Sequence, residues 1–194
     1  MRPEPLVAAL FLTAAFVLAG LAHSAWLRTR LSRRLMLPLD GGLRLRGRRV
    51  FGENKTVRGF VAIVPAAAIA FAGLFALLSA ASPEIPAALW PLSIGGYAAL
   101  GALAGLGFMA GELPNSFVKR QLDIAPGTAP HRPLAAIVSF VADRVDSILG
   151  MLVALWIVVP TPAMLWLYVL LIGPGIHLAF SALLYRLGVK ARAA

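Results

Sequence analysis

Apolar residues gather in five long runs along the chain, and polar residues gather between them. Each run is long enough to cross a bilayer as a helix, because about 20 residues span the hydrocarbon core. The runs cover residues 6–27, 57–80, 92–110, 133–159 and 163–187. The pattern predicts an all-α polytopic membrane protein with about five transmembrane helices, organised as one membrane-embedded domain over residues 1–194.

The first run has a second interpretation, a cleaved signal peptide with small residues at Ala22 and Ala25. Two features count against it. The run is longer than the apolar region of a usual signal peptide, and Arg2 is the one basic residue before it. We therefore favour a spanning helix.

Two of the polar segments are long and basic, at residues 28–56 and 112–132. Ten of the eighteen Lys and Arg residues lie from Arg28 to Arg58, and the C-terminal tail carries Lys190 and Arg192. The short segments 82–91 and 160–162 contain prolines and no basic residue. Because basic loops stay in the cytoplasm, we expect both long loops and the C-terminus to be cytoplasmic and the N-terminus to be outside.

The composition agrees with a membrane protein. The chain is 60% hydrophobic with mean hydropathy +0.84, whereas soluble domains are about 45–50% apolar. The formal net charge of +10 is concentrated in the loops, so we assign it to anionic lipids or nucleotide phosphates and expect no nucleic-acid partner. The absence of cysteine excludes disulfides, thiolate catalysis and cysteine zinc sites. We expect an integral protein of the cell inner membrane.

The fourth run contains two carboxylates, Asp143 and Asp146, in an otherwise apolar sequence. Their three-residue spacing places both on one face of a helix. Like charges in an apolar segment repel each other and resist desolvation. A divalent cation would offset this cost, and hard oxygen ligands suit Mg²⁺. The alternatives are a protonated carboxyl group and a structural ion pair with Arg144.

Two further segments combine polar and cationic side chains. Residues 51–59 (FGENKTVRG) form a Gly-bounded turn just before the second run, and helix N-terminal amides with cationic side chains form anion sites. Residues 112–120 (ELPNSFVKR) would place an acid, a hydroxyl and a base on one helical face. Each segment also has a structural interpretation, a positive-inside anchor for the first and a capped, solvated loop helix for the second.

Together these segments resemble the CTP-dependent lipid-phosphate cytidylyltransferases, most nearly CDP-archaeol synthase and its small bacterial relatives. The family pattern of Lys-Thr-Xaa-Arg/Glu-Gly, Gly-Asp-Leu-x-x-Ser-x-x-Lys-Arg, Pro-Gly and Asp-x-x-Asp matches residues 55–59, 111–120, 126–127 and 143–146. Residues 38–40 (PLD) are also similar to the archaeal enzymes. The joint match covers roughly residues 40–150 and is specific, although each motif alone is weak.

The resemblance implies that the protein makes a CDP-activated lipid and pyrophosphate from CTP and a membrane lipid phosphate, for phospholipid biosynthesis. It implies catalytic roles for Asp143, Asp146, Glu112 and Lys119, with the three carboxylates holding Mg²⁺ at a cytoplasmic face. It assigns substrate binding to a larger set: Asn54, Lys55, Thr56, Arg58, Gly59, Ser116 and Arg120.

The chain departs from the family pattern in two places. Glu112 stands where the family usually has Asp, which keeps the charge but moves it one methylene further out. The stretch between residues 127 and 143 also looks longer than in the archaeal pattern.

Three other functions share part of this pattern. A CDP-alcohol phosphatidyltransferase needs a longer acidic motif, and no acidic residue follows Asp146. A small membrane transporter would also use intramembrane acids and Gly-rich helices. Many transporters are built from internal repeats, and this sequence shows no clear repeat. A catalytically inactive homologue is the remaining alternative, because of Glu112. Five spans also leave a crevice that a twofold partner would close, which makes a homodimer possible.

Overall fold

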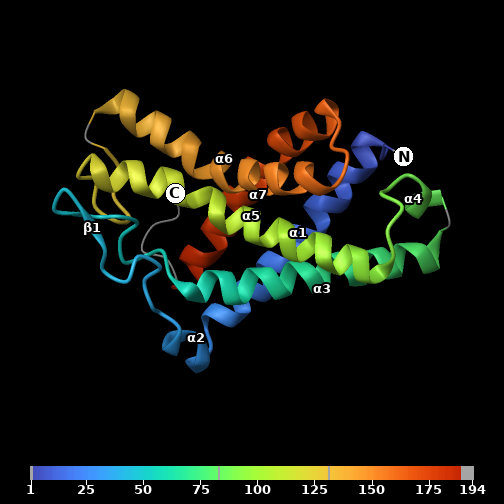
Figure 1. Cartoon of the computed structure of the whole chain (residues 1–194), viewed down its shortest axis with the longest axis horizontal. Coiled ribbons are helices and arrows are strands. Elements are labelled where there is room, and N and C mark those ends of the chain that lie inside the picture. The colour runs from blue at the N-terminus through green and yellow to red at the C-terminus, as the bar shows by residue number, and fades with distance from the viewer. Residues whose placement is uncertain (1, 83, 131, 189–194) are drawn as a thin grey trace.

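The computed structural model describes residues 2–82, 84–130 and 132–188, and five long helices dominate it (Figure 1). These are α1 (Pro5–Leu27), α3 (Val57–Ala81), α5 (Ile94–Gln121), α6 (Pro133–Val158) and α7 (Ala163–Arg186). Each overlaps one of the five predicted runs, and together they confirm the all-α fold class. The basic residues predicted in the C-terminal tail, Lys190 and Arg192, lie outside the described residues.

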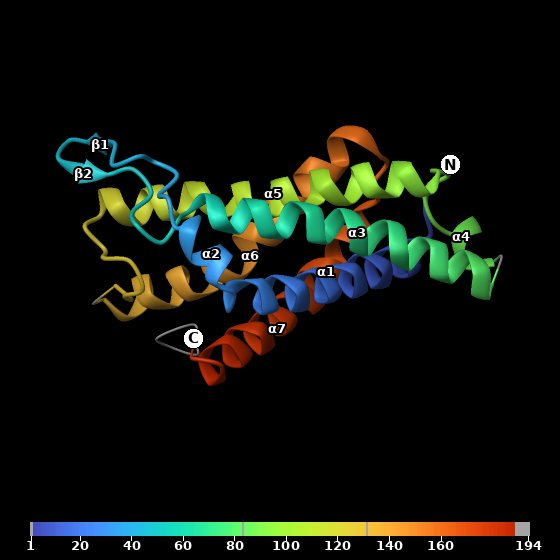
Figure 2. The same cartoon turned by 90° about the horizontal axis from the view of Figure 1, so that it is seen from below.

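The remaining elements are short and lie at the two ends of the bundle. A small helix α2 (Arg30–Arg34) and a hairpin of β1 (Arg44–Leu45) and β2 (Arg48–Arg49) follow α1. The turn helix α4 (Glu84–Ala87) lies at the opposite end, near the start of α1 (Figure 2). The long basic loop and the α4 turn are therefore separated by the length of the bundle.

Membrane crossing is supported by the helices themselves. Within the described residues, α1, α3, α5 and α7 are long and apolar enough to cross a bilayer. Helix α6 has a similar length, but it carries Asp143, Arg144 and Asp146 near its middle. The protein is thus a polytopic membrane protein, while the count of five spans and their orientation stay predictions.

The helix of the third run is longer than the run itself. The sequence predicts a span that ends at residue 110 and a polar segment over residues 112–132, and α5 continues to Gln121. The first ten residues of the polar segment are therefore helical, and the end of the span stays a prediction. The apolar run ends where the helix starts to face a polar cluster, not where the helix itself ends. Leu122 caps the C-terminus of the helix, its N–H donates to the Val118 carbonyl, and the next residue, Asp123, has the left-handed φ of 63°.

The apolar core lies in the half of the bundle nearest α4. Phe11, Phe71 and Tyr97 meet there, with ring centroids 5.4 Å apart from Phe11 to each of the other two. The Tyr97 hydroxyl donates a hydrogen bond to the Trp90 carbonyl (2.8 Å), and the Trp90 indole donates to the Pro160 carbonyl (2.9 Å). These bonds connect the start of α5 to the α6–α7 turn. The polar residues of the bundle lie in its other half.

Candidate active site

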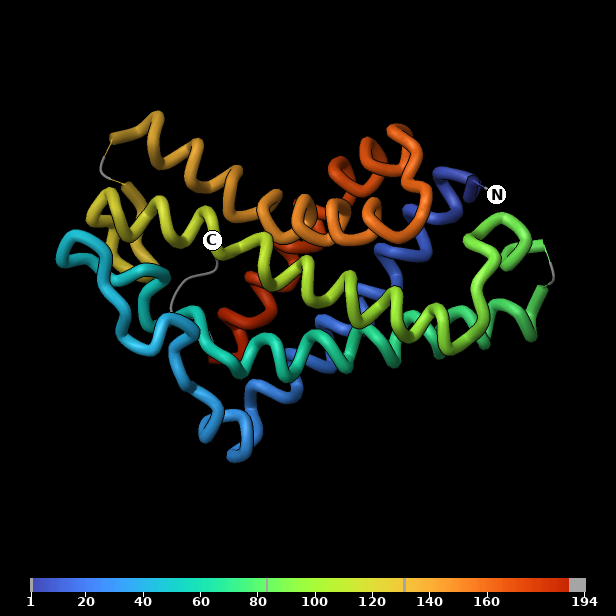
Figure 3. The backbone as a smooth tube through the Cα atoms, in the orientation of Figure 1, coloured from blue at the N-terminus to red at the C-terminus, as the bar shows by residue number. Residues whose placement is uncertain are grey.

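Glycines set the distance between α5 and α6, the two antiparallel helices that carry the acidic residues (Figure 3). A Cβ atom on Gly150 would lie 2.6 Å from the Gly111 Cα, and one on Gly107 would contact the Gly150 carbonyl and Ala154. Small residues let membrane helices approach this closely. Toward the end of the bundle that carries the long basic loop, the next turns of α5 and α6 therefore also lie close together. These turns hold the predicted carboxylates.

The acidic pair of α6 is held by two residues of α5. The Asn115 amide nitrogen donates to the Asp143 carboxylate (2.7 Å) and to the Asp146 carboxylate (2.8 Å). The Lys119 ammonium group binds both oxygens of Asp143, at 2.6 Å from Oδ2. Asn115 and Lys119 are four residues apart on one face of α5, so a single helical face supplies both partners.

Glu112 has a second set of partners. Its carboxylate forms an ion pair with Lys55 and accepts a hydrogen bond from the Ser147 hydroxyl (2.9 Å). Ser147 Oγ also lies 3.2 Å from Asp146 Oδ1. One α6 hydroxyl thus connects the carboxylates of Glu112 and Asp146. The arrangement joins Lys55, Glu112, Lys119, Asp143 and Asp146 into one polar cluster.

Lys55 reaches this cluster because Asp40 organises the loop before α3. The Asp40 carboxylate accepts hydrogen bonds from the backbone N–H groups of Phe51, Gly52 and Gly42 at 3.0–3.1 Å, and it pairs with Arg49. The Arg49 guanidinium, helped by these N–H groups, holds the pKa of Asp40 well below its usual range. The loop backbone then pairs with residues 37–39, where the Leu39 N–H donates to the Lys55 carbonyl (2.8 Å).

The other predicted binding residues of this loop have different positions. Asn54 is exposed, and Thr56 pairs with Pro38 through its backbone. Gly59 packs against α5, because a Cβ there would lie 2.5 Å from the Met109 methyl group. Arg58 lies in the first turn of α3, and its backbone N–H donates to the Leu35 carbonyl (3.1 Å).

Ser116 and Arg120, predicted to contact phosphates, lie in the last two turns of α5. Ser116 is buried, with 7% of its surface exposed. Arg120 donates to the Ile124 carbonyl and lies under Gly52, whose Cβ would be 3.2 Å from the Arg120 Cδ. In this arrangement Arg120 supports the Lys55 loop.

Three residues of the cluster were not predicted as site residues: Asn115, Ser147 and Asp40. Asn115 and Ser147 were detectable in principle, because each is three or four residues from a predicted acid or base and shares its helical face. Asp40 was not detectable in this way, because it lies in a loop and its partners are not related to it by a helical spacing.

The cluster combines oxygen donors with cations. Among the described residues, no group of three or more His, Cys, Asp or Glu side chains is arranged to hold a metal ion. The three carboxylates are instead paired with Lys55, Lys119 and Asn115. Chemically, carboxylate oxygens suit a hard divalent cation, and the lysines suit phosphate oxygens.

Comparison with known proteins gives concordant results. A family model described as CarS-like, CDP-archaeol synthase, matches residues 36–193. A CDP-archaeol synthase of Halobacterium salinarum is 34% identical over 154 residues, which cover 79% of this chain and 81% of the relative. Another from Methanosphaerula palustris is 31% identical over 167 residues, covering 79% and 87%.

One solved structure supports the fold. It is described as an intramembrane enzyme for archaeal membrane lipid biosynthesis, and it superposes on this chain with a TM-score of 0.55. The two sequences are 24% identical, and the match covers 86% of this chain and 90% of that one. At this identity the likeness concerns the arrangement of helices.

Proposed function

Because the chain belongs to the CDP-archaeol synthase family, we propose that it is an integral-membrane cytidylyltransferase that makes a CDP-lipid and pyrophosphate from CTP and a lipid phosphate. The observation that carries this proposal is the cluster at the α5–α6 crossing. Three carboxylates and two lysines meet there next to a loop rich in arginine. A reaction between two phosphate compounds needs such charges.

In this reaction an oxygen of the lipid phosphate attacks the α-phosphorus of CTP. A new P–O bond forms, the bond between the α- and β-phosphates breaks, and pyrophosphate leaves with the bonding electron pair. The attacking oxygen is already anionic, so the protein needs no strong base. It needs to position both phosphates and to neutralise charge in the transition state.

The carboxylates fit the divalent cation that such chemistry uses. Asp143, Asp146 and Glu112 would hold it, since their oxygens are the hard ligands that Mg²⁺ prefers. When bound, the ion supplies neutralisation of the charge on the phosphates.

The lysines have a role that follows from their present partners. Lys55 and Lys119 balance the carboxylates of Glu112 and Asp143 in the structure. Both ammonium groups would bind phosphate oxygens of the substrates, and the carboxylates of Glu112 and Asp143 hold them at the crossing until then. Asn115 holds Asp143 and Asp146 at a fixed separation, and so it positions both ligands.

The remaining residues support phosphate binding and orientation. Arg58, Asn54 and Thr56 border Lys55 and would contact the phosphates of CTP or of the lipid. Ser116 and Arg120 would act through the loop and the end of α5. We place the cluster at the cytoplasmic side of the inner membrane, because most basic residues lie in the loop next to it.

The test is pyrophosphate release by the purified protein with CTP and Mg²⁺. Phosphatidate and a diether glycerol phosphate would be supplied in parallel reactions. Asp143→Asn and Asp146→Asn are expected to abolish release while the protein stays folded. Asp123→Asn is the matched control, because that side chain is 81% exposed and lies in the loop after α5.

The outcomes separate the alternatives. Release that depends on CTP, metal, lipid phosphate and both aspartates would support the proposal and identify the preferred lipid. CTP-dependent thermal stabilisation without release would indicate an inactive homologue or another lipid. Neither release nor CTP binding would contradict the proposal and favour a transporter.

A further inference from the structure

The hydroxyl group of Ser147 bonds differently from those of two other helical serines. Ser24 and Ser79 donate to the carbonyl four residues earlier in their own helix, at 2.7 and 2.8 Å, which is a common bond for a serine inside a helix. The Ser147 hydroxyl instead donates to Glu112 Oε1 on α5 (2.9 Å). Ser147 is buried, with 1% of its surface exposed. A buried hydroxyl of α6 thus binds a carboxylate of the neighbouring helix.

The two donors of Ser147 serve two different carboxylates. The backbone N–H donates to Asp146 Oδ1 (2.6 Å), and the hydroxyl oxygen lies 2.9 Å from Glu112 Oε1 and 3.2 Å from Asp146 Oδ1. A serine hydroxyl has a single hydrogen. Because Asp146 Oδ1 already accepts from the N–H, we assign that hydrogen to Glu112. One residue therefore fixes the carboxylate of Glu112 relative to that of Asp146.

Both oxygens of Glu112 have a partner. Oε2 pairs with the Lys55 ammonium group, and Oε1 accepts from Ser147. Lys55 lies in the loop before α3, whereas Ser147 lies in α6 next to Asp146. The Lys55 pair thus connects Glu112 to a loop, and the Ser147 bond connects it to the helix that carries both aspartates.

The packing of the two helices explains why Glu112 meets Ser147. A Cβ atom on Gly111 would lie 2.4 Å from the Asp146 carbonyl oxygen. The two backbones therefore meet one residue before Glu112 on α5 and one residue before Ser147 on α6. Glutamate has one rotatable bond more than aspartate, so its carboxylate has more conformations to lose when it is fixed. The Ser147 bond selects one of them.

We propose that Ser147 is a positioning residue whose hydroxyl holds the carboxylate of Glu112 beside that of Asp146, and that this bond allows the site to use glutamate at position 112. The inference rests on the cytidylyltransferase function proposed above, in which these carboxylates hold the divalent cation. In Glu112→Asp the carboxylate would lie one carbon–carbon bond, about 1.5 Å, closer to α5. It would then be beyond hydrogen-bonding distance of Ser147, while the flexible Lys55 side chain follows it.

A double-mutant cycle tests this role with four proteins: the wild type, Ser147→Ala, Glu112→Asp and the double variant. Binding of Mn²⁺ without nucleotide is measured by electron paramagnetic resonance, and pyrophosphate release gives kcat. Loss of a residue that orients a metal ligand costs about 10–100-fold in metal affinity or activity. We expect Ser147→Ala to lower both quantities at least tenfold when Glu112 is present and less than twofold in Glu112→Asp. A residue that only stabilises the crossing would cause the same loss in both backgrounds, and equal losses would overturn the proposal.

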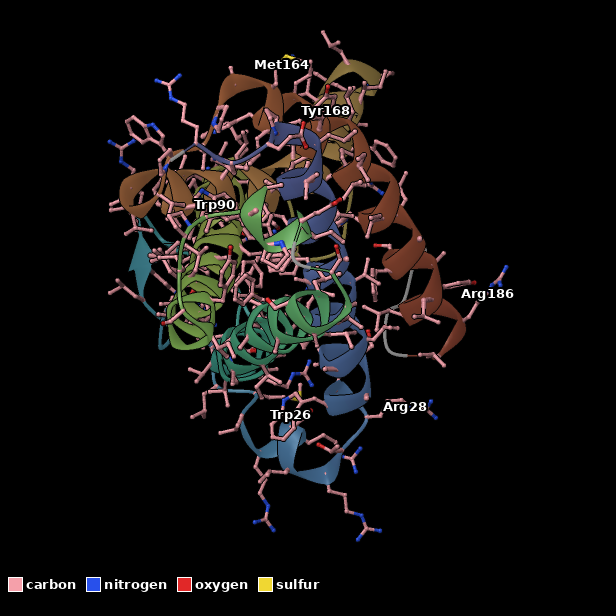
Figure 4. All side chains as sticks on the ribbon, turned by 90° about the vertical axis from the view of Figure 1, so that its right-hand side faces the viewer. Trp26, Arg28, Trp90, Met164, Tyr168 and Arg186 are labelled. Atoms are coloured by element: carbon pink, nitrogen blue, oxygen red, sulfur yellow. The ribbon has the colours of Figure 1, made fainter. Side chains whose placement is uncertain are left out.

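Ser24→Ala is the matched control, because it also removes a buried hydroxyl group from a helix. Ser24 lies two residues before Trp26, which Figure 4 shows at the α2 end of α1, and α1 carries none of the residues of the cluster. We expect Ser24→Ala to keep wild-type Mn²⁺ affinity and turnover. If both quantities fall as far as in Ser147→Ala, the loss is not specific to Ser147 and the proposal is wrong.

Ser147→Cys keeps the test decisive if Ser147→Ala does not fold. The thiol occupies the position of the hydroxyl but is a weak hydrogen-bond donor. We therefore expect this variant to bind Mn²⁺ at least tenfold more weakly than the wild type. Wild-type affinity in Ser147→Cys would contradict the proposal.

The two measurements separate this role from the proposed function. A loss of Mn²⁺ affinity that depends on Glu112, without any pyrophosphate release by the wild type, would support the role of Ser147 and contradict the enzymatic function. Pyrophosphate release by the wild type, with unchanged kcat and Mn²⁺ affinity in Ser147→Ala, would support the function and contradict the role of Ser147.

Discussion

Gly150 offers the sharpest test of how the carboxylate cluster is assembled. In Gly150→Ala the new Cβ would lie 2.2 Å from the Gly107 carbonyl oxygen and 2.6 Å from the Gly111 Cα, whereas ordinary contacts begin near 3.4 Å. The helices must therefore separate by 3.4 − 2.2 = 1.2 Å or more. The Asn115 hydrogen bonds of 2.7 and 2.8 Å would then lengthen to about 4 Å, beyond the usual limit of about 3.2 Å.

The expected effects on stability and on activity differ in size. Overpacking costs about 1–3 kcal/mol, but alanine is a better helix former than glycine by about 1 kcal/mol, so the net loss of stability is about 0–2 kcal/mol. Misplacement of reacting groups by about 1 Å lowers rates by about 100-fold. Gly150→Ala should therefore lose most of its activity while losing little stability.

The assay compares pyrophosphate release and thermal unfolding for Gly150→Ala and Gly175→Ala. The second variant adds the same methyl group to a helix where it contacts nothing within 4 Å. We expect it to keep wild-type turnover. Wild-type turnover in Gly150→Ala as well would show that the close crossing does not set the geometry of the cluster.

Three further predictions concern the charges around the crossing. Lys119→Met should weaken CTP binding, measured by calorimetry, at least tenfold. The same variant should tighten Mn²⁺ binding in the absence of nucleotide, measured by electron paramagnetic resonance, because Asp143 loses the ammonium group that pairs with it. Asp40→Asn should lower the free energy of unfolding by about 2 kcal/mol at pH 7. Because the pKa of Asp40 is lowered in the folded state, its contribution is present above about pH 4 and is lost as the pH falls further, so unfolding midpoints of this variant and the wild type should converge below pH 4. Glu112→Asp should retain turnover, since the charge that pairs with Lys55 remains, whereas Glu112→Gln should not; equal rates in a pyrophosphate assay would contradict this.

The sequence predicts the positions of the long helices well, but it does not predict which side chains interact between them. Apolar runs located all five long helices, because burial in lipid requires a continuous apolar segment. The same signal misplaced the end of α5, since residues 112–121 are helical but polar. Hydropathy measures which solvent a segment prefers and does not measure where its backbone hydrogen bonds end.

The candidate site shows the same division. The spacing of Asp143 and Asp146 predicts a shared helical face, and the structure places both against Asn115. The identity of that partner was not predictable, because a helical period does not say which helix lies opposite. The pairing of Lys55 with Glu112 joins residues 57 positions apart. It depends on the loop around Asp40, which no periodic pattern describes.

The charge balance of the cluster leads to a last prediction. With all three carboxylates ionised, Glu112, Asp143 and Asp146 contribute three negative charges, and Lys55 and Lys119 contribute two positive ones. Among the described residues Arg144 forms no ion pair with these carboxylates, because its guanidinium donates to the Phe140 carbonyl of its own helix (2.9 Å) and lies over the Phe140 ring. A bare triphosphate would therefore meet a net negative cluster inside a bilayer, where charge is costly. We expect CTP to bind at least tenfold more tightly with Mg²⁺ than with EDTA, as measured by calorimetry. Equal affinities would show that the lysines alone attract the phosphates, and that the carboxylates serve another purpose.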